Sequence, residues 1–293
     1  MSGNDENFLN FNEHKTWYSI HGKENEGTPL FIVHGGPGFP HNSLNNTVEL
    51  TKNGYPVVLY DQLGCGLSDR PDDTTLWVVE TFVEELNELR KHLGFEKINL
   101  LGQSWGGSLV MEYCLKYGEY VDKLIVHSPL IDSKLWVEEA DKLKDELPDN
   151  KGQKMRELEQ ANDTDNEEYR ALSDLFDETF VMRVIPKPQD YLDTINGAGL
   201  AVYHTMWGPS EAFATGNLKN WSVIDRLKDI SQQTLLISGK FDEATPKQMQ
   251  IIVNNIPNIE WELLNNSSHC SNLEEPYKYL KVVAGFLGSS TAR

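Results

Sequence analysis

Short runs of apolar residues recur along the chain, each bounded by turn-forming residues. They are rich in Ile, Val and Leu, and they are too continuous for strands of a sheet with one face in water. Before the first run, residues 8–12 and 16–22 predict a hairpin at a sheet edge. The runs themselves predict buried parallel strands, and they occupy residues 29–33, 56–60, 98–102, 123–128 and 233–239.

Helical patterns separate these strands. In residues 81–94, for example, four apolar side chains share one helical face, namely Phe82, Leu86, Leu89 and Leu93. Strands that alternate with helices predict an α/β fold, in which a mostly parallel central sheet is flanked by helices.

The alternation stops after residue 132. Amphipathic helical patterns occupy residues 134–147 and 167–184, with no clear strand from 133 to 186, and helix and loop extend to about residue 221. The strand pattern at 233–239 then resumes the alternation. We therefore predict a core formed by residues 1–132 and 222–293, interrupted by a helical cap at 133–221 that covers the site.

Composition limits the possible partners. The 293 residues are 39% hydrophobic and 24% charged, as in an ordinary globular protein, and the formal net charge is −19. This negative charge argues against nucleic acid and anionic membranes as partners, and it weakly favours a cationic substrate.

The chain lacks several targeting and framework signals. It has no run approaching the ~20 apolar residues of a membrane span, and the N-terminus lacks the basic and apolar regions of a secretory signal. Its three cysteines show no CxxC spacing, which fits reduced thiols better than a disulfide framework or a zinc site. We expect a cytoplasmic protein.

The segment from Gly102 to Gly106 has the pattern G-x-S-x-G, with Ser104 at its centre. It follows the predicted strand at 98–102 and precedes a helical run. A sharp strand-to-helix turn requires small residues two positions either side of the serine, because side chains there would collide with backbone. The turn presents the serine oxygen at a cleft beside a helix N-terminus. This context predicts the α/β-hydrolase fold with Ser104 as nucleophile.

A serine nucleophile requires a base, and this fold uses the order Ser…Asp…His. Asp242 follows the predicted strand at 233–239, and His269 follows a further predicted strand at 260–264. Both therefore lie at the edge of the sheet where sites form in open α/β folds. Of eight histidines, His269 alone follows Asp242 in the chain. We predict that His269 is the general base and acid and that Asp242 orients it.

The segment from His34 to Gly38, HGGPG, follows the first buried strand, where this fold places an HGGG-type loop. Glycines let backbone amides approach a substrate oxygen closely. We predict an oxyanion hole formed by the amides of Gly36 and Trp105, and a structural role for His34.

Three blocks together resemble the proline iminopeptidases: HGGPG, DQLGCG at 61–66 and GQSWGG at 102–107. The likeness extends over nearly the whole chain, and the last two blocks are more specific than G-x-S-x-G. The resemblance implies removal of an N-terminal residue, preferentially proline, without metal or cofactor. Related amidases that act on prolinamide and other amino-acid amides share these motifs.

An aminopeptidase must bind a free ammonium or iminium group, and a desolvated cation needs carboxylates facing it. The resemblance implies that Glu211 and Glu243 supply them. Trp105, Trp207 and Phe213 are candidates for apolar walls of the pocket, and Ala212 stands where the family usually has an aromatic residue.

The leading hypothesis is a serine exopeptidase that releases N-terminal proline, or another small residue, from short peptides with a free amino terminus. The closest alternative is an amino-acid amidase. The two glutamates argue against an esterase or lactonase, and Ser104 argues against dehalogenases and epoxide hydrolases. A non-catalytic binding protein would normally have lost a member of the triad. The oligomeric state, peptide length and strictness of the proline preference stay open.

Overall fold

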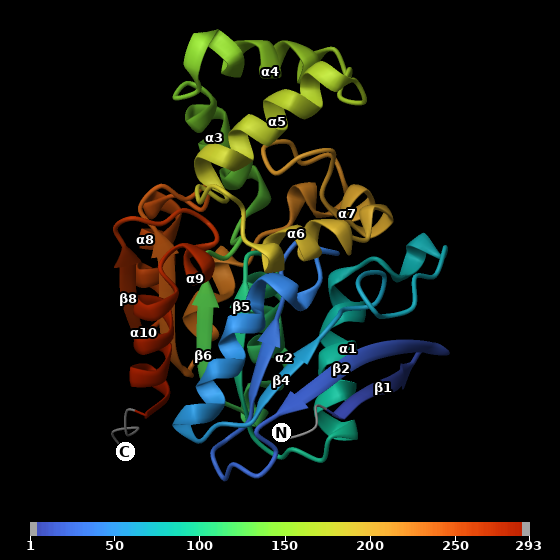
Figure 1. Ribbon diagram of the computed structural model, residues 1–293, viewed down its shortest axis with the longest axis vertical. Coiled ribbons are helices and arrows are strands. Elements are labelled where there is room, and N and C mark those ends of the chain that lie inside the picture. Colours follow the sequence, from blue (N-terminus) through green and yellow to red (C-terminus); the bar gives the residue numbers. More distant parts are fainter. Residues whose placement is uncertain (1–4, 289–293) are drawn as a thin grey trace.

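The computed structural model describes residues 5–288, and its strands form one sheet in the order β1-β2-β4-β3-β5-β6-β7-β8 (Figure 1). The pairs β1·β2 and β2·β4 are antiparallel and the other neighbours are parallel. This confirms the predicted mostly parallel sheet with a hairpin at its edge. The strands are β1 (Asp5–Phe11), β2 (His14–His21), β3 (Leu30–Val33), β4 (Val57–Tyr60), β5 (Ile98–Gln103), β6 (Val121–His127), β7 (Gln233–Gly239) and β8 (Ile259–Leu264).

Helices connect the strands, and among residues 5–288 none has the length and hydropathy needed to cross a membrane. The α-helices are α1 (Val79–His92), α2 (Trp105–Tyr117), α3 (Ser133–Lys144), α4 (Lys151–Gln160), α5 (Glu167–Phe180), α6 (Gln189–Asn196), α7 (Leu200–Met206), α8 (Pro246–Asn255), α9 (Ser271–Glu274) and α10 (Pro276–Gly288). The 3₁₀ segments are η1 (His41–Asn53), η2 (Thr74–Leu76), η3 (Gly118–Tyr120), η4 (Pro148–Asn150), η5 (Asn217–Asn220) and η6 (Ile224–Asp229).

Both faces of the sheet are covered by helices, which explains why the strand patterns are continuously apolar. Alternate residues of a strand point to opposite faces. In β3, Phe31 and Val33 belong to an apolar cluster with α1, α2 and α8, whereas Leu30 and Ile32 belong to a second cluster with η1 and α10. Every residue of β3 is therefore buried.

Helices α3 to α7 come between β6 and β7 in the chain, and we call them the inserted helices. Figure 1 shows them above the end of the sheet toward which β6 points. Helices α3 to α5 share an apolar cluster of their own, which includes Ala140, Met155, Tyr169 and Phe176. The amphipathic patterns predicted α3 and α5, whereas the shorter α6 and α7 had no prediction of their own.

Candidate active site

Ser104 occupies a strained turn between β5 and α2, with φ 58° and ψ −124°. Its amide donates to the carbonyl of His127 at 2.9 Å. A Cβ atom at Gly102 would lie 2.2 Å from the oxygen of Gly106, and one at Gly106 would lie 2.1 Å from the oxygen of Val33. The two glycines are therefore required sterically, as the G-x-S-x-G pattern predicts, and they allow the turn that exposes the serine hydroxyl.

Asp242 lies after β7, and its buried carboxylate accepts hydrogen bonds from four groups. Its Oδ1 accepts from Nδ1 of His269 and from the amide of Ala244, both at 2.8 Å. Its Oδ2 accepts from Oγ of Ser128 and, at 3.2 Å, from the amide of Gly239. These donors hold the carboxylate in one orientation.

His269 lies after β8, with its ring packed edge-on against Trp136 at 5.9 Å between centroids. Burial lowers the pKa of His269, but the charge and hydrogen bond of Asp242, together with the charge of Glu211, outweigh it. The net effect raises the pKa above its ordinary value. The bond to Asp242 leaves Nε2 as the nitrogen that can take a proton.

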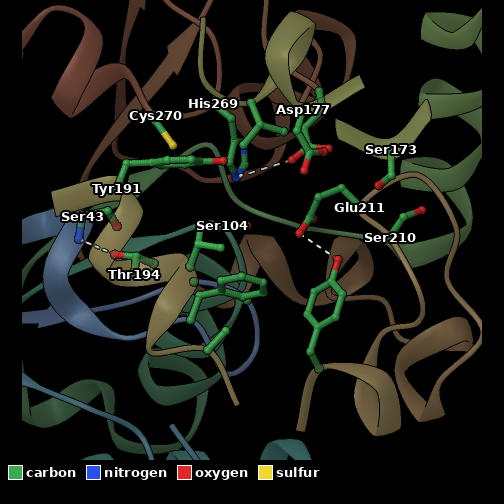
Figure 2. A pocket seen from close by; sticks show the side chains of 18 of the residues that line it. Ser43, Ser104, Ser173, Asp177, Tyr191, Thr194, Ser210, Glu211, His269 and Cys270 are labelled. Carbon is green, nitrogen blue, oxygen red and sulfur yellow. Dashed lines mark hydrogen bonds and ion pairs between the residues drawn. The ribbon is translucent and has the colours of Figure 1, made fainter. Parts of the chain in front are cut away.

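Ser104 and His269 line the same cavity, which has a volume of about 440 Å³ (Figure 2). Within residues 5–288, no hydrogen bond joins Ser104 Oγ to His269 Nε2. Catalytic hydrogen bonds are often long in unliganded enzymes and tighten when substrate binds. The structure thus brings the three predicted triad residues together, with the Asp–His bond formed and the Ser–His bond open.

The motif blocks of the family resemblance contact one another beneath the cavity. The amide of Gln62 donates to Nε2 of His34 at 2.8 Å, and Nε1 of Trp105 donates to Oε1 of Gln62 at 2.9 Å. Burial lowers the pKa of His34 to about 4, so its imidazole is neutral and can accept that bond. His34 therefore has the structural role predicted for it, and the Trp105 ring belongs to the core.

The predicted oxyanion hole lies beside Ser104. Gly36 has φ 109°, a conformation that favours glycine, and a Cβ at neighbouring Gly35 would lie 3.0 Å from Cβ of Ser104. Neither the amide of Gly36 nor that of Trp105 donates a hydrogen bond to another group in the described part of the chain. Both amides are therefore available to an oxyanion on the carbon that Ser104 attacks.

Glu243 lines the cavity and is 0% exposed, yet neither carboxylate oxygen has a hydrogen-bond partner among the described residues. Its Oε1 lies 3.8 Å from Nε2 of His269. Burial and the nearby charges of Glu211, Asp177 and Asp242 raise the pKa of Glu243 well above its ordinary value. A buried carboxylate in this state is a strong acceptor for a cation that enters the cavity.

Glu211 also lines the cavity, and its Oε1 accepts a hydrogen bond from the hydroxyl of Tyr203 at 2.8 Å (Figure 2). Burial raises the pKa of Glu211, and the bond from Tyr203 and the charge of His269 partly offset this. The cavity therefore contains two predicted amine-binding carboxylates within the electrostatic reach of the predicted base.

The three aromatic residues predicted as walls of the pocket lie elsewhere. The residues that line the cavity, all within 5–288, do not include Trp105, Trp207 or Phe213. Trp207 packs edge-on against Trp136, and its Nε1 donates to the carbonyl of Ser210 at 3.0 Å. Trp207 thus supports the loop that leads to Glu211, and Phe39, Tyr191 and Tyr203 are the aromatic residues that line the cavity.

Sequence patterns missed three polar residues of the site. Ser128 directly follows β6 and has a positive φ of 48°, a conformation with no signature in the sequence. Tyr203 on α7 and Asp177 near the end of α5 belong to helices whose orientation over the sheet could not be predicted. The signal for Asp177 was its placement in an amphipathic helix close to apolar Phe176 and Phe180.

The loop that carries His269 is tied to the end of α5. The amide of His269 donates to the carbonyl of Phe180 at 3.2 Å, and the amide of Cys270 donates to that of Val181 at 3.0 Å. The hydroxyl of Ser268 donates to the same Val181 carbonyl at 3.0 Å. The predicted base is thus positioned by an inserted helix as well as by the sheet.

Comparison with known proteins agrees with this geometry. Residues 28–276 match the alpha/beta hydrolase fold family. The proline iminopeptidase of Heyndrickxia coagulans is 39% identical over 264 residues, which cover 90% of this chain and 91% of the relative. This chain belongs to the proline iminopeptidase family. The predicted resemblance and the predicted α/β-hydrolase fold are thereby confirmed.

Solved structures support the same family. The proline iminopeptidase of Mycobacterium smegmatis is 36% identical, with 97% of each chain covered and a TM-score of 0.89. VinJ is 35% identical, with 96% of this chain and 97% of that chain covered and a TM-score of 0.92. The roles of the individual site residues stay predictions, for which the geometry above is the support.

Proposed function

We propose that this proline iminopeptidase family member is a serine aminopeptidase that releases N-terminal proline, or another small residue, from short peptides. The observation that carries the proposal is Glu243: a fully buried carboxylate, without a hydrogen-bond partner among the described residues, in the cavity that Ser104 and His269 line. Together with Glu211 it suits a free, positively charged amino terminus.

The reaction would begin when Ser104 Oγ attacks the carbonyl carbon of the first residue. His269 Nε2 takes the serine proton, and Asp242 stabilises the resulting imidazolium. The amides of Gly36 and Trp105 stabilise the oxyanion, by about 3–4 kcal/mol for each donor.

His269 then returns the proton to the leaving amine as the C–N bond breaks, which leaves an acyl ester on Ser104. A water molecule, deprotonated by His269, cleaves this ester and restores the serine. Glu211 and Glu243 set the register, because an amino group bound to them places the first carbonyl at Ser104.

The inserted helices complete the site, and we propose that residues 133–221 act as a cap between two core segments, 1–132 and 222–293. The amidase alternative is not favoured, since relatives that match most of the chain are named proline iminopeptidases. The cytoplasmic location stays a prediction.

The test compares four substrates: prolyl-p-nitroanilide, its N-acetyl form, prolinamide and a Pro-Xaa-Xaa tripeptide. We expect cleavage of the free-amine anilide and the tripeptide, and no turnover of the acetylated anilide. Equal rates with and without the acetyl group would refute the amine site. Turnover of prolinamide with the tripeptide untouched would make the protein an amidase.

A further inference from the structure

The cavity contains a third inward-facing carboxylate that the two-glutamate amine site does not use. Asp177, near the end of α5, lines the cavity with Glu211 and Glu243. Figure 2 shows Asp177 and Glu211 entering from the side opposite Thr194, with Ser104 and His269 between the two sides.

One carboxylate oxygen of Asp177 is left without a hydrogen bond from the described part of the protein. Its Oδ1 is buried and has no hydrogen-bond partner within residues 5–288. Lys187 also lines the cavity, but its ion pair is with Glu178, at 3.8 Å. Burial and the charge of Glu211 raise the pKa of Asp177 well above its ordinary value. The side chain is therefore placed to accept hydrogen bonds from something other than the protein.

The fully buried Glu243 independently indicates that the cluster receives a ligand. Both of its oxygens face the same cavity without a hydrogen-bond partner in the described part of the chain. The charges also act within the cluster, since Glu211 raises the pKa of Asp177, and Glu211 and Asp177 both raise the pKa of Glu243. The three carboxylates thus form one group around one volume.

The number of N–H donors on the substrate decides how many carboxylates it can use. A protonated prolyl nitrogen has two N–H bonds, whereas a protonated primary amine has three. These bonds diverge at tetrahedral angles, and hydrogen bonds weaken as they bend. The two oxygens of a single carboxylate are too close together to meet two diverging N–H bonds well. Each N–H is best matched by a separate carboxylate.

We propose that Asp177 accepts the third N–H of a primary ammonium, and that it thereby extends the enzyme from N-terminal proline to small residues with a primary amine, such as alanine. The proposal rests on the proposed aminopeptidase function. Glu211 and Glu243 suffice for the two N–H bonds of proline. A primary ammonium would leave one buried donor unsatisfied without Asp177, and such a group is costly.

The experiment measures kcat/KM for three p-nitroanilides: prolyl, alanyl and N-methylalanyl. The last has the side chain of alanine but the two N–H bonds of proline. The enzymes are the wild type, Asp177→Ala, Asp177→Asn and Asp174→Asn. Asp174 lines the same cavity from the same helix, is exposed, and controls for a simple change of charge.

We expect Asp177→Ala to lower kcat/KM for the alanyl substrate by about tenfold to a hundredfold relative to the prolyl substrate. The change in kcat/KM for the N-methylalanyl substrate should match that for the prolyl substrate. Asp177→Asn keeps an oxygen acceptor and should have a smaller effect. Asp174→Asn should leave the alanyl-to-prolyl ratio unchanged. Turnover of the prolyl substrate shows in each case that the variant is folded.

Equal losses for the alanyl and prolyl substrates in Asp177→Ala would overturn the proposal, and so would a wild type that cleaves prolyl but not alanyl anilide. If N-methylalanyl followed alanyl, ring shape rather than donor number would be the cause, and the proposal would again fail. These outcomes differ from failure of the proposed function, in which acetylation of the prolyl substrate would not change its rate.

Discussion

Two neighbouring residues after β7, Asp242 and Glu243, have the same chemical group in opposite circumstances. Asp242 accepts hydrogen bonds from four groups of the protein, whereas Glu243, the next residue, has no hydrogen-bond partner within residues 5–288. Both side chains are buried. The carboxylate of Asp242 is bound by groups of the protein and orients His269. The carboxylate of Glu243 is stabilised only when a cation binds to it. Until then, its burial without a partner destabilises the folded protein.

The largest effect on activity should come from Asp242, whose carboxylate has hydrogen-bond partners in the protein. We expect Asp242→Asn to lower kcat by about 10⁴-fold, because the amide would hold His269 in the wrong tautomer. KM for prolyl-p-nitroanilide should change little, since the amine site is intact. Steady-state kinetics at constant pH give both constants. A loss below tenfold would mean that another group orients the histidine.

Glu243→Gln should weaken binding of the substrate's amino group, and thereby lower kcat/KM for prolyl-p-nitroanilide by about 10²- to 10³-fold. Its effect on stability should be the opposite of that on activity. The pKa of Glu243 is raised in the folded state, so its ionisation destabilises the fold increasingly as the pH rises above about 4.5. The glutamine variant should therefore melt at a higher temperature than wild type at pH 8.

Glu262→Gln is the control for that variant, because Glu262 lies on β8 in a partly exposed ion pair with Lys278 at 2.8 Å. We expect wild-type kinetics and a melting temperature near that of wild type. If Glu243→Gln lowered both activity and stability, Glu243 would have a structural partner and the contrast with Asp242 would be broken.

Glu85 is a buried, incompletely hydrogen-bonded carboxylate away from the cavity. It tests whether such a group lowers stability without contributing to activity. Its Oε1 accepts from Thr16 and from the amide of Leu63, and burial raises the pKa of Glu85 to about 8. The stability it contributes is present below about pH 4.5 and is lost as the pH rises toward 8. Glu85→Gln should remove this loss and add on the order of 2–4 kcal/mol to the free energy of unfolding at pH 7.

Denaturant unfolding of wild type and Glu85→Gln at pH 5 and pH 8 measures this difference. The gain from glutamine should be larger at pH 8, and kcat/KM should not change, since the residues that line the cavity, within 5–288, do not include Glu85. A gain that is the same at both pH values would show that ionisation of Glu85 is not the cause.

The smallest effect concerns a single donor to Asp242. Ser128→Ala should lower kcat by about tenfold, because three donors still hold the carboxylate. Ser108→Ala is matched to it: Ser108 is buried and donates to the carbonyl of Leu130 at 2.7 Å, away from Asp242. That control should lose stability without losing activity. Equal kcat values for the two variants would exclude a positioning role for Ser128.

The sequence predicted the parts of the site that depend on local backbone geometry. Gly102 and Gly106 are required by contacts within a few residues and with β3, and Asp242 and His269 follow strands whose apolar patterns are clear. Chain order and strand ends were therefore enough to group the triad.

The orientation of the inserted helices could not be predicted from the sequence. Trp207 was expected at the pocket wall, yet it packs on Trp136, because a position in a motif does not determine which way a side chain turns. Asp177 was one acidic residue among 45 Asp and Glu. Its location depends on how α5 crosses the sheet, which tertiary packing decides. The order of the strands, with β4 between β2 and β3, was likewise not predictable from the pattern.

The bonds from Ser268, His269 and Cys270 to the end of α5 have a consequence for motion. They join the predicted base to the helix that carries Asp177, so a local opening that frees one must disturb the other. In hydrogen exchange, the amides of His269 and Cys270 should therefore exchange together with the last turn of α5. Helices α6 and α7, which also line the cavity, are the elements that can move at its mouth while α5 and the base stay together.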